Sequence, residues 1–386
     1  MSDGERVQTL EELEAQNDDF RVRYGRLLST WPEDADCQAL VGELRVFLGV
    51  CAAHGRYMPF GTLERRSLRN MGDYWSSRLD RDGHAVDGIP GLEGYNPKAG
   101  IPLDATCPYP GLGPYDAKHS CDFFGREGLA KDYTERLEKQ GIFLIIGGSG
   151  SGKSSVALAG VGPLCQARHP DWCFPPPIKP GADPLGALAT SIVAGSGRDA
   201  GTLANALRDS PAAAVSILAG MLGDQPVLLV IDQFEELLTL CRDEDAQRAF
   251  AEVLLALAPP EALKNGRRFY LLFTLRSDHL GRLEDTPHLK HLHDRLIVAE
   301  AYKYLPSMQA EDILQAILKP ARRVRLRFVP ATVAERLAGQ TASLTNGLPL
   351  LQFALLRLWS GRTQDEYGRR LDFIDEEQLA ALPDVS

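Results

Sequence analysis

Residues 142–154 of the chain read Ile-Phe-Leu-Ile-Ile-Gly-Gly-Ser-Gly-Ser-Gly-Lys-Ser. The run Ile142–Ile146 is apolar and partly β-branched, which is typical of a buried strand, and it ends abruptly at a glycine. The next eight residues, Gly147–Ser154, fit the pattern G-x-x-x-x-G-K-[ST] of a phosphate-binding loop. A strand, this loop and the helix-compatible segment Ser155–Val161 follow one another in the order that phosphate binding requires.

Glycines and serines in the loop allow consecutive backbone N–H groups to turn inward on an anion. Lys153 would reach the β- and γ-phosphates of a nucleotide, and Ser154 would ligate Mg²⁺. The helix that starts there would point the positive end of its dipole at the phosphates. We therefore predict nucleotide contacts from Gly147, Gly148, Ser149, Gly150, Ser151, Gly152, Lys153, Ser154 and Ser155. The alternative interpretation is a glycine-rich turn with a chance lysine.

A second motif is the stretch Val227–Glu236, which reads Val-Leu-Leu-Val-Ile-Asp-Gln-Phe-Glu-Glu. Five apolar residues that end in an acid are expected of a buried parallel strand whose tip carries a carboxylate directed at a metal. Asp232 would hold Mg²⁺ directly or through water. Either Glu235 or Glu236 would orient and deprotonate the attacking water.

A further strand is predicted over Phe269–Thr274. Arg276 would lie at the end of this strand, beside the strand that carries Asp232, where its guanidinium could reach the γ-phosphate. The alternative role for Arg276 is a salt bridge to Asp278 or Glu235.

Composition sets the broad class of the protein. At 386 residues, 44% apolar and 24% charged, the chain has the size and composition of a soluble protein with two or three domains. Its first residues are too polar for a signal peptide, and no apolar run reaches the roughly 18 residues of a membrane span, so we expect a cytoplasmic protein without a membrane partner. Seven cysteines, an odd number, favour reduced thiols. A net charge of −10 opposes nucleic-acid binding as the main activity.

The chain before the phosphate loop divides in two. Residues 1–82 are predicted to form a small helical bundle, with a capping box at Thr9 and Glu12 and a third helix over about Thr62–Leu79. Nothing in this bundle looks catalytic. Glycine and proline crowd residues 83–106, which we interpret as a linker because this density disfavours helix and strand interiors.

Three further segments resemble a known family. Cys107–Leu112 and Phe123–Glu127 precede the phosphate loop, and Gly347–Pro349 follows it as a G-x-P motif. Together with the Asp-x-x-acid-acid pattern and the segment around Arg276, they resemble the bacterial STAND signalling NTPases, specifically the group called novel STAND NTPase 1. The resemblance covers about residues 107–380, with the motifs in family order.

The resemblance implies further site residues. In the family the segment before the phosphate loop covers the nucleotide, so Phe124, Gly125 and Arg126 are carried over as neighbours of the adenine and ribose. Pro349 is carried over as a residue that packs near the adenine. For the phenylalanines, packing of a helix onto the sheet is the alternative, and for Pro349 a proline in the first turn of a helix suffices.

The fold prediction is an α/β P-loop core, residues 107–304, with a five-stranded, mainly parallel sheet and a C-terminal helical lid, residues 305–386. The five strands are predicted over 142–146, 172–178, 227–231, 269–274 and 296–299. The family continues into a winged helix and often a sensor, so the chain is interpreted as truncated or minimal.

The functional prediction is a switch that binds ATP or ADP with Mg²⁺, hydrolyses ATP slowly, and oligomerises or exposes residues 1–82 to an unknown protein partner. The family implies bacterial signalling, plausibly defence against phage. The alternatives are a DNA-associated ATPase of the initiator type, which salt-dependent DNA binding would reveal, and a scaffold that holds nucleotide without turnover.

Overall fold

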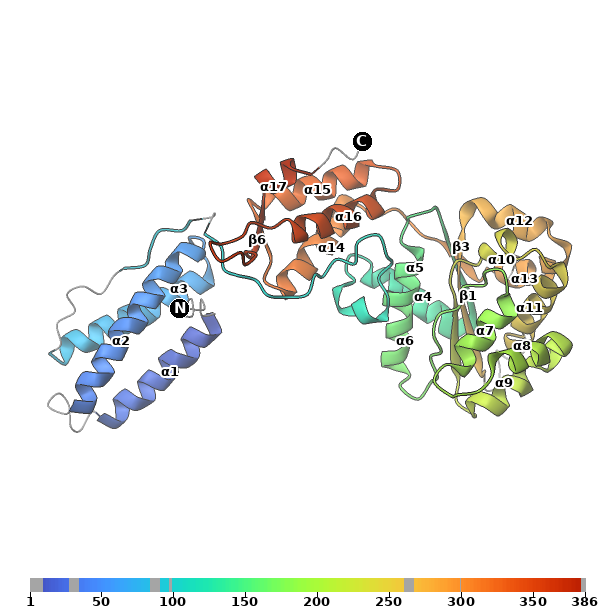
Figure 1. Cartoon of the computed structure of the whole chain (residues 1–386), viewed down its shortest axis with the longest axis horizontal. Coiled ribbons are helices and arrows are strands. Elements are labelled where there is room, and N and C mark those ends of the chain that lie inside the picture. The colour runs from blue at the N-terminus through green and yellow to red at the C-terminus, as the bar shows by residue number, and fades with distance from the viewer. Residues whose placement is uncertain are drawn as a thin grey trace. The chain divides into compact units, whose positions relative to one another are not determined.

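The computed structural model describes residues 10–27, 35–83, 91–96, 99–259, 267–298 and 300–382 (Figure 1). The chain divides into two compact units. The first unit contains Met1–Asp104, Leu326–Pro330 and Arg362–Glu376, and the second contains Ala105–Arg325, Ala331–Gly361 and Glu377–Ser386.

The second unit is built on a parallel sheet, as the sequence predicts. Its strands are β1 (Ile142–Gly147), β2 (Val227–Ile231), β3 (Phe269–Arg276) and β4 (Tyr302–Tyr304). They lie in the order β2-β3-β1-β4, and every neighbouring pair is parallel. The carboxyl ends of β1, β2 and β3 therefore lie at one edge of the sheet, where Gly147, Asp232 and Arg276 meet.

The sheet has four strands and not the predicted five. The segment predicted over 172–178 runs parallel to β2 but pairs only through two isolated bridges, Cys173 with Val227 and Ile178 with Ile231. Prolines at 175–177 lie between the bridges and have no N–H to donate, so the ladder cannot continue across them.

The prediction of a strand over 296–299 is wrong. Residues Asp294–Val298 are helical, and Ala299 lies outside the described residues. The chain turns at Glu300, where φ is 54°, and the strand β4 begins only at Tyr302. A short apolar run fits a buried helix as well as a strand, which explains the error.

Alternate residues of β1 supply two apolar cores, as the two-residue repeat of a strand requires. Ile142, Leu144 and Ile146 belong to the larger core, and Phe143 and Ile145 to the smaller. In Figure 1, helices α4 and α6 lie on one side of β1 and β3, and helices α7, α8, α9 and α11 lie on the opposite side. The bounds are α4 (Glu127–Gln140) and α6 (Gly162–Arg168) on the first side, and α7 (Pro184–Val193), α8 (Ala200–Asp209), α9 (Ala214–Leu222) and α11 (Glu244–Leu257) on the second.

Shorter helices join these elements. They are α5 (Lys153–Ser155), α10 (Glu236–Thr239), α12 (Leu280–Asp285), α13 (Lys290–His293) and α17 (Glu376–Ala380). The helix after the phosphate loop extends beyond the predicted segment Ser155–Val161, because α5 continues through a π-helical stretch, Val156–Val161, directly into α6.

The helical lid belongs to the same unit as the sheet. It consists of α14 (Ala310–Arg323), α15 (Thr332–Ser343) and α16 (Gly347–Ser360), and α15 packs against both other helices. Helix α14 is held to the segment before the phosphate loop by three polar contacts. They are Tyr109 Oη to the Ile317 carbonyl at 2.8 Å, Lys319 to Glu127 at 2.8 Å and Arg323 to Asp122 at 2.6 Å.

The first unit contains the three predicted helices. They are α1 (Leu10–Leu27), α2 (Ala35–His54) and α3 (Leu63–Arg81), and they share one apolar core. The predicted Thr9 cap lies outside the described residues, whereas Thr62 caps α3 by accepting from the Arg65 N–H. Helix α2 with the turn after it, Ala35–Tyr57, is long and apolar enough to cross a membrane, and half of its apolar window is buried inside the protein.

The glycine- and proline-rich segment also belongs to this unit. Its residue Glu93 donates its backbone N–H to the Ala52 carbonyl of α2 at 2.9 Å. Further on, Pro102 bridges to Leu371, beside the parallel pair β5 (Arg327–Val329) and β6 (Phe373–Asp375). The described linker residues are thus hydrogen-bonded without forming a helix or a longer strand.

Candidate nucleotide-binding site

The phosphate loop connects β1 to α5 through two glycines with positive φ. Gly150 has φ of 68° and Gly152 has φ of 91°, a backbone region that side chains with a Cβ disfavour. A Cβ at Gly150 would also lie 2.8 Å from Cγ of Pro349, at the start of α16. The loop therefore needs glycine both for its own shape and for the close approach of the lid.

Lys153 is the cation of this loop. Its side chain is buried, and Nζ donates to the Gly148 carbonyl at 2.7 Å. Burial lowers the pKa of Lys153, and the nearby carboxylates of Glu235 and Asp232 oppose that shift. The structure thus holds an ammonium group inside the loop, next to two acids.

Asp232 follows the last residue of β2 and is completely buried. Its Oδ1 accepts from Ser154 Oγ at 2.7 Å and from Thr274 Oγ1 at 2.6 Å. Its Oδ2 is buried and has no hydrogen-bond partner among the described residues. A buried carboxylate oxygen without a donor is unfavourable, so this atom suits a cation or a water bound to one.

The donor set fits Mg²⁺ in particular. Asp232 and Ser154 offer hard oxygen ligands, which Mg²⁺ prefers. Across the described residues, no three His, Cys, Asp or Glu side chains come together as a metal cluster. This agrees with a Mg²⁺ site that takes its remaining ligands from substrate phosphates and water.

The two glutamates after β2 have different partners. Glu235 is buried, and its Oε2 accepts the backbone N–H of Arg276 at 3.2 Å. Glu236 begins α10, and its Oε2 accepts the backbone N–H of Gly181 at 3.2 Å. Both residues line the same cavity as Lys153, so either is placed to serve as a base.

Arg276 ends β3, as the sequence predicts. Its guanidinium makes a two-point ion pair with Asp278, with Nε to Oδ1 at 3.1 Å and Nη2 to Oδ2 at 2.7 Å. This hydrogen bonding raises the pKa of Arg276 and lowers the pKa of Asp278. The alternative ion pair is therefore present, and the side chain nevertheless lines the cavity.

Arg126 joins the phosphate loop to the start of the lid. Its guanidinium donates to the Ser151 carbonyl at 3.0 Å and to the Pro306 carbonyl at 2.9 Å. Burial lowers its pKa to about 10. Phe124 lines the cavity, whereas Gly125, with φ of 85°, forms a turn tight against Asp312 and Met308.

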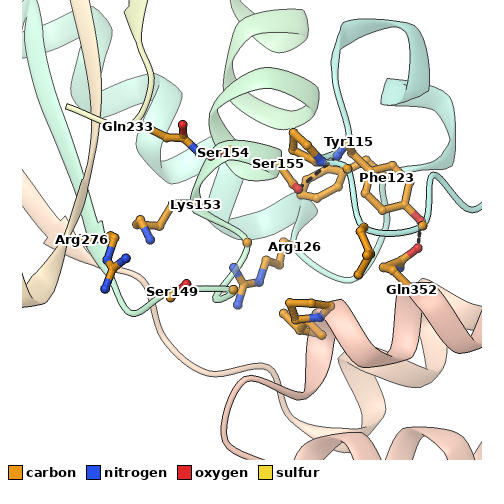
Figure 2. A pocket seen from close by; sticks show the side chains of 18 of the residues that line it. Tyr115, Phe123, Arg126, Ser149, Lys153, Ser154, Ser155, Gln233, Arg276 and Gln352 are labelled. Atoms are coloured by element: carbon orange, nitrogen blue, oxygen red, sulfur yellow. Dashed lines mark hydrogen bonds between the residues drawn. The ribbon is translucent and has the colours of Figure 1, made fainter. Parts of the chain in front are cut away.

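One cavity of about 550 Å³ connects these groups, a volume in the range of small-molecule sites. Of the predicted site residues, those that line it are Ser149, Gly150, Gly152, Lys153, Ser154, Ser155, Phe124, Arg126, Glu235, Glu236, Arg276 and Pro349. Those that do not are Gly147, Gly148, Ser151, Gly125 and Asp232. Figure 2 shows Lys153 and Arg276 at one end, Tyr115, Phe123 and Gln352 at the other, and Arg126 between them.

Sequence reasoning missed several lining residues, among them Tyr115, Lys179, His279, Met308 and Gln352. Two of them had a usable signal. Lys179 directly follows the segment predicted over 172–178, so it lies at the same edge of the sheet as Asp232. Gln352 lies three residues after Pro349 on α16 and therefore on the same helical face.

The protein-family model described as Novel STAND NTPase 1 matches residues 108–378 of this chain. A search of curated proteins finds no match.

Several solved structures match part of this chain. The ORC2 protein of Aeropyrum pernix, in ADPNP and ADP complexes, is 17% identical with a TM-score of 0.41, and the match covers 66% of this chain and 65% of that one. The Walker-type ATPase PABY2304 of Pyrococcus abyssi is 15% identical with a TM-score of 0.41, over 67% and 72% of the two chains. Drosophila ORC bound to DNA is 13% identical with a TM-score of 0.38, over 61% and 54%. The chain thus spans just under two thirds of the length of the first of these structures.

Proposed function

Because the chain belongs to the novel STAND NTPase 1 family, we propose that it is a signalling switch driven by ATP and Mg²⁺. In this proposal ATP binds in the cavity at the carboxyl edge of the sheet, and slow hydrolysis to ADP resets the switch. The protein would act in the bacterial cytoplasm, in signal transduction and antiviral defence.

The observation that carries the proposal is that one cavity is lined by both the core and the lid. Arg126 donates to the phosphate loop and to the first residues of the lid connection, and Pro349 of α16 approaches Gly150. A ligand between them contacts both parts. Such a ligand shifts an equilibrium between open and closed forms by its differential affinity for the two.

Each polar group has a proposed role. The backbone of residues 147–152 and the ammonium of Lys153 bind the phosphates. Asp232 and Ser154 hold Mg²⁺, which when bound neutralises charge that develops on the phosphates. Glu236 or Glu235 accepts a proton from the attacking water. The guanidinium of Arg276 separates from Asp278 and contacts the γ-phosphate.

The output of the switch is proposed from the chain's organisation. On ATP binding the lid closes, and the closed form associates with further copies or makes residues 1–82 available to a protein partner. None of the described residues in this range lines the cavity, and we assign the range to the output and not to the nucleotide.

Two measurements on the full chain test this function. Phosphate release from ATP with and without Mg²⁺ reports turnover, and mass determination with ADP or a non-hydrolysable ATP analogue reports association. We expect slow, Mg²⁺-dependent release and a larger assembly with the analogue. Turnover without any change of mass or conformation would leave an ATPase that is not a switch, and no nucleotide binding would refute the proposal.

A further inference from the structure

The end of the cavity away from Lys153 is largely apolar. The apolar residues that line it are Leu112, Pro114, Tyr115, Phe123, Phe124, Met308, Ala316, Leu348, Pro349 and Leu351. Rings and aliphatic side chains from the core and the lid surround this space, which suits a flat aromatic ligand such as a nucleobase. Apolar walls bind any base, however, and do not distinguish one purine from another.

Two amide side chains line the cavity within the described part of the chain, and they lie at different ends. Gln233 directly follows Asp232, and its backbone N–H donates to Thr274 Oγ1 at 2.9 Å, so it belongs to the phosphate end. Gln352 lies on α16 beside Leu351, at the apolar end. A primary amide offers both an acceptor and a donor, which is what the edge of a base requires.

The amide of Gln352 accepts a hydrogen bond from a tyrosine of the core. Tyr115 Oη donates to Gln352 Oε1 at 3.3 Å, as Figure 2 shows. The tyrosine is buried, and this burial raises its pKa, so the hydroxyl keeps its proton near neutral pH. Its backbone N–H donates to Ser155 Oγ at 3.2 Å, which anchors the tyrosine to the first turn after the phosphate loop.

The tyrosine also opposes a flip of the amide. If Nε2 and Oε1 exchanged places, the buried Tyr115 O–H would face a donor and lose its acceptor. An unsatisfied buried hydroxyl is unfavourable, so Oε1 stays toward the tyrosine. Oε1 keeps a second lone pair, and Nε2 donates to no protein atom among the described residues.

The position of Gln352 suits the distance from phosphate to base. Pro349 lies against Gly150 of the phosphate loop, and Gln352 follows it by three residues on the same helix. At a rise of about 1.5 Å per residue, three residues span roughly 4.5 Å, so Gln352 lies about that much further along the helix axis than Pro349. A nucleotide whose phosphates occupy the loop would extend its base in this direction.

We propose that Gln352 selects adenine, with its Oε1 accepting from the 6-amino group and its Nε2 donating to a neighbouring ring nitrogen. Tyr115 is the positioning residue that keeps the amide in this orientation. The inference rests on the proposed function, because it takes an adenine nucleotide as the ligand. It adds a residue that ties the identity of the base to the closed position of the lid.

The discrimination follows from the pattern of donors and acceptors. Adenine presents a donor at position 6 beside an acceptor nitrogen, which matches Oε1 and Nε2. Guanine presents an oxygen at position 6, and hypoxanthine does the same, so each would place an acceptor against Oε1. A two-point contact of this kind discriminates by a factor of about ten or more.

The test measures the affinities of ADP, IDP and GDP by calorimetry on the full chain, because diphosphates avoid turnover. Gln352→Met keeps the length of the side chain and removes both polar groups. Gln340→Met, on the exposed face of α15 and outside the cavity, is the matched control. Tyr115→Phe removes only the hydroxyl that orients the amide.

We expect the wild-type chain to prefer ADP over IDP and GDP by about tenfold or more. Gln352→Met should weaken the affinity for ADP about tenfold and change the affinities for IDP and GDP by no more than about twofold, which removes the preference for ADP. Tyr115→Phe should reduce the preference by less, and Gln340→Met should leave it unchanged. Retained IDP and GDP binding also shows that the variants are folded.

Two results would overturn the inference while sparing the proposed function. One is a wild-type chain that binds all three diphosphates equally. The other is a Gln352→Met chain that loses affinity for all three diphosphates alike. That loss would show that Gln352 acts through the packing of the lid and not through a contact with the base. A wild-type chain that binds none of the three refutes the proposed function itself, and the inference with it.

Discussion

The two ends of the cavity are built in different ways. The phosphate end is supplied mainly by residues of one short stretch, Ser149–Ser155, with acids and an arginine from the neighbouring strand tips. The apolar end is assembled from four separate segments, at 111–115, 122–126, 308–316 and 348–352, which come from both the core and the lid. A local motif therefore predicts the phosphate end, whereas only the folded chain brings the residues of the apolar end together.

This difference predicts how each end responds to change. Substitutions at the phosphate end should remove chemistry or binding for every nucleotide alike, because phosphates are common to all of them. Substitutions at the apolar end should alter the preference among nucleotides, or the coupling to the lid.

Glu236→Gln should have the largest effect, because it removes a candidate base and keeps the size of the side chain. General-base catalysis contributes about 10²- to 10⁴-fold, so phosphate release should fall by that factor while ATP binding persists. Glu235→Gln is the matched comparison, since both acids line the cavity. Normal turnover in Glu236→Gln together with loss in Glu235→Gln would assign the base to Glu235.

Lys153→Ala should abolish tight binding of ADP and GDP to the same extent. A lost hydrogen bond to a charged group costs about 1.5 to 3 kcal/mol, or roughly ten- to a hundredfold in affinity. Calorimetry measures this loss, with Lys290→Ala on the exposed surface of α13 as the control. Wild-type affinity in Lys153→Ala would remove this lysine from the site.

Asp232→Asn should remove the part of ATP affinity that depends on Mg²⁺. The substitution replaces the carboxylate, including its buried Oδ2, with a neutral amide. A neutral amide binds a hard cation such as Mg²⁺ more weakly than a carboxylate does. Chelation of Mg²⁺ with EDTA should weaken ATP binding in the wild-type chain and change it little in the variant. The exposed Asp245→Asn serves as the control, and equal EDTA sensitivity in both variants would exclude Asp232 as a ligand.

The same contrast explains what the sequence could predict. The order of glycines, Lys153 and Ser154 after an apolar run specifies the phosphate loop, because the loop binds through its own backbone. Tyr115 and Gln352 are 237 residues apart and belong to no motif, so only the packing of lid on core brings them together. Sequence analysis therefore predicted residues at the Lys153 end of the cavity and left Gln352, the proposed contact to the base edge, unassigned.

The errors in the sheet have a similar origin. The run Leu296–Val298 is apolar enough for a strand, but it is the turn at Glu300 that decides where β4 begins. Residues 172–178 do run beside β2, yet three prolines prevent a continuous ladder. In both places the apolar pattern located a segment that packs against the apolar cores, and backbone hydrogen bonding decided its form.

The smallest predicted effect concerns the coupling between the two ends. Arg276 is paired with Asp278, and both side chains are exposed, so the γ-phosphate of ATP has a competitor for this guanidinium. ATP should protect α16 from hydrogen exchange more than ADP does, because only ATP draws Arg276 away from Asp278. Arg276→Ala should erase this difference and largely spare ADP binding.

Asp278→Asn sharpens this last prediction, since it removes the competitor and keeps Arg276. Exposed ion pairs contribute little, so the extra protection of α16 by ATP should grow only a few-fold. A change in the same direction in Asp245→Asn, which lies away from the cavity, would mean that net charge and not Arg276 is responsible. Equal protection of α16 by ATP and ADP in the wild-type chain would mean that the two ends of the cavity are not coupled. The lid would then respond to the base and not to the γ-phosphate.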